Sequence, residues 1–240
     1  MLGLGNSLTT GSVHEQMYSL LLDGTGDYLY TNDSVATSNN MSFSAWINRS
    51  ATGSMAILSK HDGSGGNIFI MGLYDTDKFH VRVRNGSHSE TTYNTLNEWK
   101  HVVVTLTESG GDTTAKVYLD GSLSWSQDLG ANVMGTTTGN PWSIGQEWDS
   151  GSTSDHFNGK IDEVAIWNTT LDADAITVVY NSGKPFDLTS DKTTGVKVYD
   201  NASDLQMFLR MSNDATDSSG KGHHGTLQGD ATFSTDTPDD

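Results

Sequence analysis

GKIDEVAIWN, residues Gly159 to Asn168, is the stretch of sequence that decides the fold. Its apolar residues alternate, as they do in a β-strand that buries one face. Asp162 stands among inward-facing apolar neighbours such as Val164 and Ile166, where an unpaired carboxylate is strongly disfavoured. The stretch therefore indicates a strand on which Asp162 either lies at an edge or meets a cation.

A short helix is predicted directly after this strand, over Thr170 to Lys184. Asp172 and Asp174 fall in its first turn, where carboxylates oppose the positive end of the helix dipole. Apolar residues recur at helical spacing and form one stripe, Ile176, Val179 and Tyr180. We therefore expect one short helix near residues 171–182.

The rest of the chain has the composition of an all-β protein. Hydrophobic residues make up 34% of the 240 residues, and 26 residues are Gly. Alternating runs separated by turn dipeptides such as Asn85-Gly86 and Asp120-Gly121 predict short strands joined by hairpins. We therefore predict two antiparallel sheets packed face to face. The predicted strands are Tyr18 to Leu22, Tyr28 to Tyr30, Met41 to Asn48, Ala56 to Lys60, Ile68 to Tyr74, Lys78 to Arg84, Trp99 to Thr107, Thr114 to Leu119, Leu123 to Ser126, Trp142 to Gly145 and Gly159 to Trp167.

Charge and cysteine content exclude several classes of function. The net charge of −17 argues against nucleic-acid binding, which depends on basic patches. The only basic cluster, Lys78, His80, Arg82 and Arg84, is typical of a solvated strand face. The absence of Cys excludes disulfides and cysteine catalysis. The opening MLGLGNSLTTGSV has no basic or long apolar region, so we expect neither a Sec signal peptide nor membrane insertion.

Three segments are expected along the chain: an N-terminal arm over 1–17, a sandwich over 18–186 and a C-terminal tail over 187–240. The tail holds a strand-like run, Leu205 to Met211, and later apolar residues such as Leu227 and Phe233. Disordered segments generally lack such residues. We therefore expect the tail to pack on the sandwich with an additional strand. Alternatives are a truncated repeat or donation of that strand to a neighbouring subunit.

Six motifs follow one another in the first three quarters of the chain. They are YSLLLDGTGDYLY (Tyr18 to Tyr30), MSFSAWI (Met41 to Ile47), ILSK (Ile57 to Lys60), EWKHVVVTL (Glu98 to Leu106), AKVYLDGSL (Ala115 to Leu123) and GKIDEVAIWNTTLDADAI (Gly159 to Ile176). Together they resemble the LamG-like jelly-roll domains of the concanavalin A-like lectin and glucanase superfamily. The resemblance implies a jelly roll of two curved antiparallel sheets.

A second resemblance concerns the opening MLGLGNSLTTG, which is similar to the openings of structural proteins of tailed phages, particularly marine ones. It implies a non-catalytic adhesion or structural module exposed on a virion, as a capsid decoration or tail component. The partners would then be a glycan, a cell-surface protein or other virion subunits. The alternative is a secreted or surface lectin-like protein that binds carbohydrate. A homo-oligomer is compatible with both, and either places the protein in the virion or outside the cell.

The family resemblance also implies a structural calcium beside the last strand, with Asp162 as a ligand. Calcium takes about six to eight oxygen ligands, many of them backbone carbonyls. The loop Asp23-Gly24-Thr25-Gly26-Asp27 and the carboxylate of Asp217 offer further oxygens. Alternatively, Asp23 and Asp27 form turns and Asp162 accepts backbone hydrogen bonds.

Catalysis is not expected from this sequence. Glycoside hydrolysis needs two carboxyl groups on either side of the scissile bond. Glucanases of this superfamily place them at alternate positions of one strand, whereas Glu163 directly follows Asp162 and should point to the opposite face. We therefore predict a binding protein rather than an enzyme.

The long connection from Thr136 to Asn158 is the predicted ligand-binding segment. Aromatic rings stack on sugar faces, and nearby polar groups pair with hydroxyls. This connection has the densest mixture of both outside a regular strand, namely Trp142, Trp148, Asp149, Asp155 and His156. The alternative is that Trp142 and Trp148 seal the sandwich.

Overall fold

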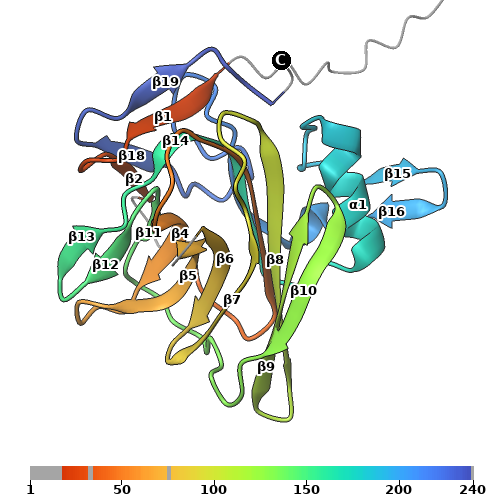
Figure 1. Ribbon diagram of the computed structural model, residues 1–240. Helices are drawn as coiled ribbons and strands as arrows, with labels where there is room; N and C mark the ends of the chain where they lie inside the picture. The colour runs from red at the N-terminus through yellow and green to blue at the C-terminus, as the bar shows by residue number, and fades with distance from the viewer. Residues whose placement is uncertain (1–17, 32–34, 75–76, 239–240) are drawn as a thin grey trace, which may run out of the picture.

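The computed structural model describes residues 18–31, 35–74 and 77–238. Two antiparallel sheets pack face to face, with one short α-helix on the outer side of one sheet (Figure 1). The predicted all-β jelly-roll sandwich is confirmed. No helix in the described ranges is long and apolar enough to cross a membrane.

The eight-stranded sheet has the order β10-β9-β8-β3-β14-β1-β19, and β17 also pairs with β14. Its strands are β1 (Ser19–Asp23), β3 (Met41–Arg49), β8 (Lys100–Ser109), β9 (Asp112–Leu119), β10 (Ser122–Asp128), β14 (Asn158–Trp167), β17 (Leu205–Leu209) and β19 (Thr232–Ser234).

The seven-stranded sheet has the order β18-β2-β11-β4-β5-β6-β7. Its strands are β2 (Tyr28–Thr31), β4 (Met55–His61), β5 (Asn67–Tyr74), β6 (Lys78–Val83), β7 (Gly86–Thr92), β11 (Trp142–Ile144) and β18 (Gly225–Gln228). The remaining elements are the hairpins β12 (Glu147–Asp149) with β13 (Ser152–Ser154) and β15 (Lys192–Thr194) with β16 (Lys197–Tyr199), the helix α1 (Ala173–Tyr180), and the 3-10 turns η1 (Asn181–Gly183) and η2 (Ala202–Asp204).

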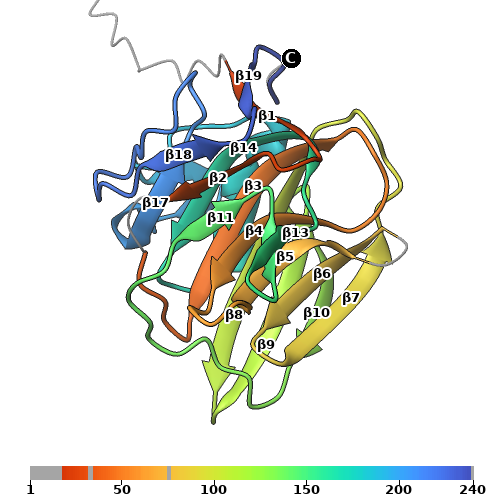
Figure 2. The ribbon, with the colours of Figure 1, turned by 90° about the vertical axis from the view of Figure 1, so that its left-hand side faces the viewer.

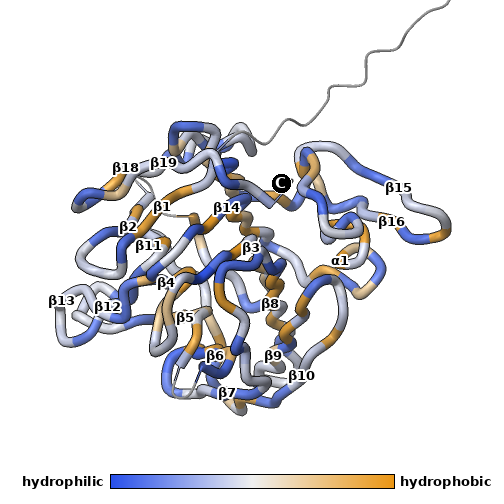
Figure 3. The backbone as a smooth tube through the Cα atoms, turned by 45° about the horizontal axis from the view of Figure 1, so that its top comes forward, coloured by the Kyte–Doolittle hydropathy of each residue, from blue (hydrophilic) through white to orange (hydrophobic). Residues whose placement is uncertain are grey.

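The main core lies between the two sheets. The tube through β3, β8 and β14 carries repeated hydrophobic stretches (Figure 3), and their inward side chains are fully buried. The rings of Phe43 and Phe69 stack across the sandwich with centroids 4.1 Å apart, and Trp142 lies 5.4 Å from Phe43. Such aromatic packing adds to the stabilisation that burial alone gives.

Strand β14 occupies the middle of its sheet. It pairs with β3 along one side, and with β1 and then β17 along the other. Asp162 is therefore fully buried in a central strand rather than at an edge. A β-bulge interrupts the register between Asp162 and Ala165. At this bulge Glu163 takes a left-handed backbone, with φ of 50°.

Helix α1 covers the outer face of the eight-stranded sheet. Asp172 caps its first turn by accepting a hydrogen bond from the Ala175 N–H at 2.8 Å. Asn181 ends it in the left-handed region, with φ of 48°. A second core forms between the sheet and the helix, and includes Tyr118, Trp167, Ile176, Val179 and Phe208.

The C-terminal tail adds strands to both sheets. β17 continues the pairing of β14, β18 pairs with β2, and β19 pairs with β1. Met207, Phe208 and Leu209 are fully buried. The tail of this chain thus supplies outer strands of its own sandwich.

Candidate functional site

One row of facing residues crosses the whole seven-stranded sheet. From β18 to β7 it consists of Thr226, Tyr30, Ser143, Ser59, Ile70, Arg82 and Ser87. Directly paired residues of an antiparallel sheet project to the same side. Phe69 and Met71, the neighbours of Ile70, point into the core. The row therefore lies on the outer face, away from the other sheet.

A pocket of about 330 Å³ opens on this face at β5, β6 and β7. Ligand pockets commonly hold about 300 Å³ or more. We call it the Arg82 pocket, and its lining residues are Ile70, Tyr74, His80, Arg82, Asn85, Ser87 and Glu147.

The Arg82 pocket combines an exposed ring with polar groups. Tyr74 is 40% exposed, and its ring lies 4.9 Å from that of His80. Nδ1 of His80 is 2.7 Å from the Ser89 hydroxyl. Arg82 donates its Nε–H to the carbonyl of Arg84 at 2.8 Å. An aromatic face beside a guanidinium and an amide suits a ligand with both an apolar face and hydroxyl groups.

Glu147 brings the β12–β13 hairpin to the rim of the pocket. Its carboxylate accepts hydrogen bonds from the Asn67 amide and, at 2.8 Å, from the Ser154 hydroxyl. Burial raises the pKa of Glu147, and Asp155 adds to this effect. Oδ1 of Asn67 also accepts the backbone N–H of Trp148 at 3.1 Å, and Nδ2 of Asn67 donates to the backbone carbonyl of Trp148 at 2.7 Å. One Asn side chain thus attaches the hairpin to β5.

Trp142 requires a correction. It was predicted as a ligand-binding residue, but it is fully buried on β11. Its indole N–H donates to the Val35 carbonyl at 3.1 Å, and Lys60 Nζ lies 5.4 Å from its ring centroid. The cause is the short pairing of β11 with β2 and β4, which turns this ring into the core. Trp142 seals the sandwich, as the alternative interpretation held.

The other predicted ligand-binding residues lie on or beside the β12–β13 hairpin. Trp148 is half-buried, with its ring 4.7 Å from that of His61. Asp149 is exposed, whereas Asp155 is half-buried with a pKa raised by burial and by Asp149. His156 is half-buried and its ring lies 6.3 Å from Tyr28. These four residues do not line the Arg82 pocket, and their part in ligand binding stays a prediction.

The predicted calcium ligands do not come together. Leu20 pairs with Ile161 and Asp23 with Asn158, so Asp23 and Asp162 are four strand positions apart, or roughly 13 Å at about 3.3 Å per residue. An oxygen of Asp162 accepts the Glu163 N–H at 2.9 Å. Among the described residues, no group of three or more His, Asp or Glu side chains is arranged for a metal ion.

Asp27 and Asp217 are occupied by hydrogen bonds of their own. Asp27 accepts the N–H groups of Asp230 at 2.6 Å and Asp23 at 3.3 Å, and so closes the turn that contains Gly24. Asp217 accepts four hydrogen bonds, from Phe208, from both the N–H and the hydroxyl of Ser219, and from His223. The predicted ligands therefore do not fit one calcium shell, and calcium binding stays a prediction of the family resemblance.

Sequence reasoning missed most of the Arg82 pocket. His80 and Arg82 were interpreted as a solvated face, and Tyr74, Asn85, Ser87 and Glu147 were not selected. These residues come from four strands whose adjacency depends on register. One sequence feature could have indicated part of the pocket. The two strand patterns on either side of residues 75–77 predict a hairpin, and this hairpin places Tyr74 opposite Lys78.

Comparison with known proteins agrees with this fold. Residues 23–177 match a family described as the concanavalin A-like lectin/glucanases superfamily. No curated protein matches the sequence. A solved structure from Bacteroides ovatus, provisionally described as a carbohydrate-binding protein, is 18% identical with a TM-score of 0.64. That comparison covers 92% of this chain, which spans only 60% of the Bacteroides protein.

Two further solved structures are similar. The native heptameric SAP-like pentraxin of Limulus polyphemus is 17% identical with a TM-score of 0.61, over 89% of this chain and 95% of that one. The CBM40 domain of a Ruminococcus gnavus IT-sialidase, bound to α2,3-sialyllactose, is 12% identical with a TM-score of 0.50, over 60% of this chain and 84% of that one. At these identities the similarity shows the fold alone.

Proposed function

Because the chain belongs to the concanavalin A-like lectin and glucanase superfamily, we propose that it is a non-catalytic carbohydrate-binding domain. The observation that carries the proposal is the Arg82 pocket. Its volume suits a sugar unit. The ring of Tyr74 offers a stacking surface, and Arg82 and Asn85 offer hydrogen-bond donors for hydroxyl groups.

The structural neighbours support this choice. The Bacteroides ovatus protein is provisionally described as carbohydrate-binding, and the Ruminococcus gnavus domain was solved with a bound sialyllactose. Because both share only the fold with this chain, they suggest the class of ligand and not its identity.

The proposal includes no hydrolysis. A glycosidase needs two carboxyl groups about 5 to 10 Å apart around the scissile bond. Glu147 is the only carboxylate among the residues that line the pocket, and its oxygens accept hydrogen bonds from Asn67 and Ser154. Asp162 and Glu163 lie on β14 in the other sheet.

A virion role has less support. It was predicted from residues 1–11, which lie outside the described residues, and none of the similar proteins reported above comes from a phage. We therefore place carbohydrate binding, the alternative from the sequence, ahead of the virion role. The location in a virion or outside a cell stays a prediction.

A glycan array that includes sialyllactose tests the proposal. We expect the wild-type protein to bind a defined set of glycans, and both Arg82→Ala and Tyr74→Ala to lose about tenfold or more in affinity with unchanged thermal midpoints. Leu123→Ala, at an exposed position on β10 of the other sheet, is the matched control and should bind like wild type. The proposal fails if no glycan is bound, or if the two pocket variants bind like the control.

A further inference from the structure

Buried polar groups without hydrogen-bond partners gather between Ser143 and His156. In the described part of the chain, five such atoms come from this segment: Ser143 Oγ, both amide atoms of Gln146, Trp148 Nε1 and His156 Nδ1. Ser143 and Gln146 are fully buried. Proteins rarely leave buried polar atoms unpaired, because each loses its hydrogen bonds to water. Such a concentration in one segment calls for an explanation by function.

These groups lie next to the proposed glycan site. Ser143 belongs to the residue row that also contains Ile70 and Arg82. It is two strands from Ile70, or roughly 10 Å at about 4.8 Å per strand. On its other side, Ser143 pairs with Tyr30, whose half-exposed ring lies 6.5 Å from that of Tyr28. Ser143 therefore lies between an aromatic surface and the Arg82 pocket, and Gln146 directly precedes Glu147, which lines that pocket.

The β12–β13 hairpin covers this region. β12 lies against β4 and β5, and Figure 2 shows β13 in front of both strands. The backbone carbonyl of Gln146 accepts the Ser59 hydroxyl at 2.8 Å. The base of the segment is closed by two hydrogen bonds of Gly145, one to Ile57 at 3.0 Å and one from Phe157 at 2.9 Å. Residues 146–156 thus form a flap over the row.

The attachments of this flap are mostly polar. Besides the side chain of Asn67 and the Ser59 hydroxyl, they include hydrogen bonds from the Gly151 N–H to the Gly65 carbonyl at 2.9 Å and from the Ala56 N–H to the Asp155 carbonyl at 2.7 Å. The rings of Trp148 and His156 add contacts with those of His61 and Tyr28. Segments that bury little apolar surface open at low free energy. Because its attachments are mostly polar, we expect the flap to open without unfolding the sandwich.

We propose that the β12–β13 hairpin covers a second sugar subsite, in which Ser143 and Gln146 hydrogen-bond the hydroxyl groups of an oligosaccharide. The inference rests on the proposed glycan binding at the Arg82 pocket. A carboxamide offers both donors and an acceptor, as a pair of sugar hydroxyls requires. Because the subsite lies about 10 Å from the pocket, the ligand is an oligosaccharide rather than a single sugar. Tyr28 and Tyr30 stack on its far end.

The test is Gln146→Leu, measured on glycans printed as a graded series of chain lengths from monosaccharides upward. We expect this variant to melt at a higher temperature than wild type, because an unpaired amide is replaced by an apolar group of similar size. We also expect this variant to bind the longer glycans about tenfold or more weakly than wild type does. Its affinity for monosaccharides should equal that of wild type. Gln206→Leu is the control, since Gln206 Nε2 donates to the Asp204 carbonyl at 3.0 Å. It should show no rise in melting temperature and unchanged binding.

The outcomes separate the two proposals. Absence of any glycan binding by wild type overturns the proposed function and this inference together. Wild-type binding that Gln146→Leu leaves unchanged at every chain length overturns the second subsite alone. Amide hydrogen exchange provides a measurement that needs no variant: residues 147–154 should exchange faster than β4 and β5. Equal protection of these three segments contradicts an opening hairpin.

Discussion

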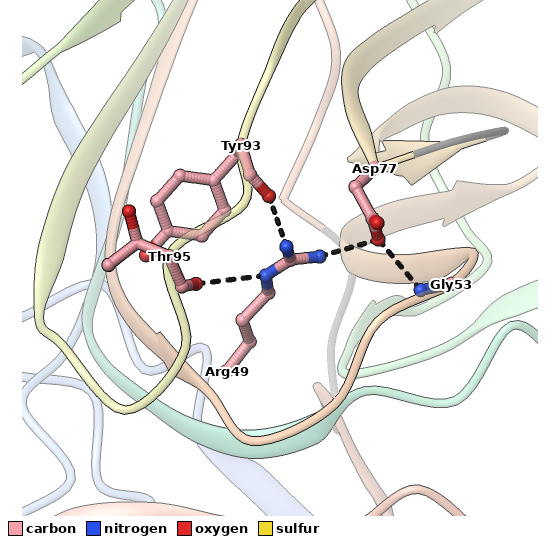
Figure 4. A network of polar contacts seen from close by, with 5 residues as sticks. All are labelled: Arg49, Gly53, Asp77, Tyr93 and Thr95. Carbon is pink, nitrogen blue, oxygen red and sulfur yellow. Dashed lines mark hydrogen bonds and ion pairs between the residues drawn. The ribbon is translucent and has the colours of Figure 1, made fainter.

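Arg49 and Asp77 form an ion pair, with Nη1 of the fully buried Arg49 2.7 Å from Oδ1 of Asp77 (Figure 4). The same guanidinium donates to the carbonyl groups of Thr95, at 3.1 Å, and Tyr93. Asp77 in turn accepts the Gly53 N–H at 2.7 Å. A single side chain at the end of β3 thus holds the loop before β8 and the turn before β6.

Replacing Asp77 should destabilise the protein strongly. Asp77→Asn removes the negative charge and leaves a buried guanidinium without its anion, while Asn tolerates the left-handed backbone at this position, where φ is 63°. We expect the free energy of unfolding in urea to fall by about 3 kcal/mol. The hydrogen bond from Gly53 and the charge of Arg49 hold the pKa of Asp77 below its usual value. This stabilisation is therefore present above the unfolded carboxyl pKa of about 3.9 and is lost as the pH falls through the folded value.

Asp174→Asn is the control for this measurement. Asp174 lies 3.6 Å from Lys197 on the surface, and exposed pairs contribute about 1 kcal/mol or less. Equal losses for the two variants would contradict the special role of the Arg49 pair.

His101 should make stability depend on pH in mildly acidic solution. Burial between the eight-stranded sheet and α1 lowers the pKa of His101 to about 4, against an opposing effect of Asp120. The unfolded chain takes up a proton near pH 6.5, whereas the folded protein does not until about pH 4. The contribution of His101 to the free energy of unfolding is therefore complete above pH 6.5, and the free energy of unfolding falls by about 3 kcal/mol as the pH drops toward 4. Urea unfolding at a series of pH values measures this loss. A His101→Phe variant should show a weaker dependence, and an identical slope in both proteins rules the explanation out.

The sequence predicted strands best where one face is buried. β3, β5, β8 and β14 were recognised from their apolar alternation, which follows directly from packing between sheets. β7, GSHSETT, was missed because it is an edge strand without buried apolar residues. The β12–β13 hairpin was missed because each strand has only three residues.

The site was less predictable than the fold. Its residues meet only through the lateral order and register of β5, β6 and β7, which no local pattern contains. Trp142 and Trp148 show what a local sequence pattern cannot predict. Both are aromatic residues in one connecting segment, yet β-pairing buries the first and leaves the second half-exposed.

These two Trp residues should respond in opposite ways to replacement by Ala. Trp142→Ala leaves a cavity beside Phe43 and Phe69 and should cost about 3 to 5 kcal/mol in unfolding free energy. Trp148→Ala should change stability by about 1 kcal/mol or less, because Asn67 still holds the backbone of residue 148. We expect it to weaken glycan binding, since Trp148 directly follows Glu147 of the Arg82 pocket and its buried indole N–H has no hydrogen-bond partner in the protein. A Trp148→Ala protein that binds like wild type would exclude this ring from the site.

Calcium should have little effect on stability. The carboxylates of Asp162, Asp27 and Asp217 accept hydrogen bonds from the protein, so a calcium ion would have to displace these bonds before gaining their oxygens. We expect equal thermal midpoints in millimolar calcium and in EDTA. Native mass spectrometry under both conditions checks the same point directly. Detection of a calcium-bound protein whose thermal midpoint is higher in calcium than in EDTA would contradict this prediction and support the calcium site implied by the family resemblance.

The C-terminal strands should be required for folding. Truncation after Asp204 removes β17, β18 and β19, and with them the fully buried Met207, Phe208 and Leu209. It also leaves β1 and β2 as open edges and uncovers part of β14, and unpaired edges promote aggregation. We expect this variant to be insoluble or to lack a cooperative thermal transition by circular dichroism. Truncation after Asp230 removes β19, whose residues are at most half-buried, together with Asp236 and its ion pair with Lys160. This shorter truncation should fold with a lowered midpoint. A soluble, cooperatively folded protein that ends at Asp204 would show that the sandwich is complete without its tail.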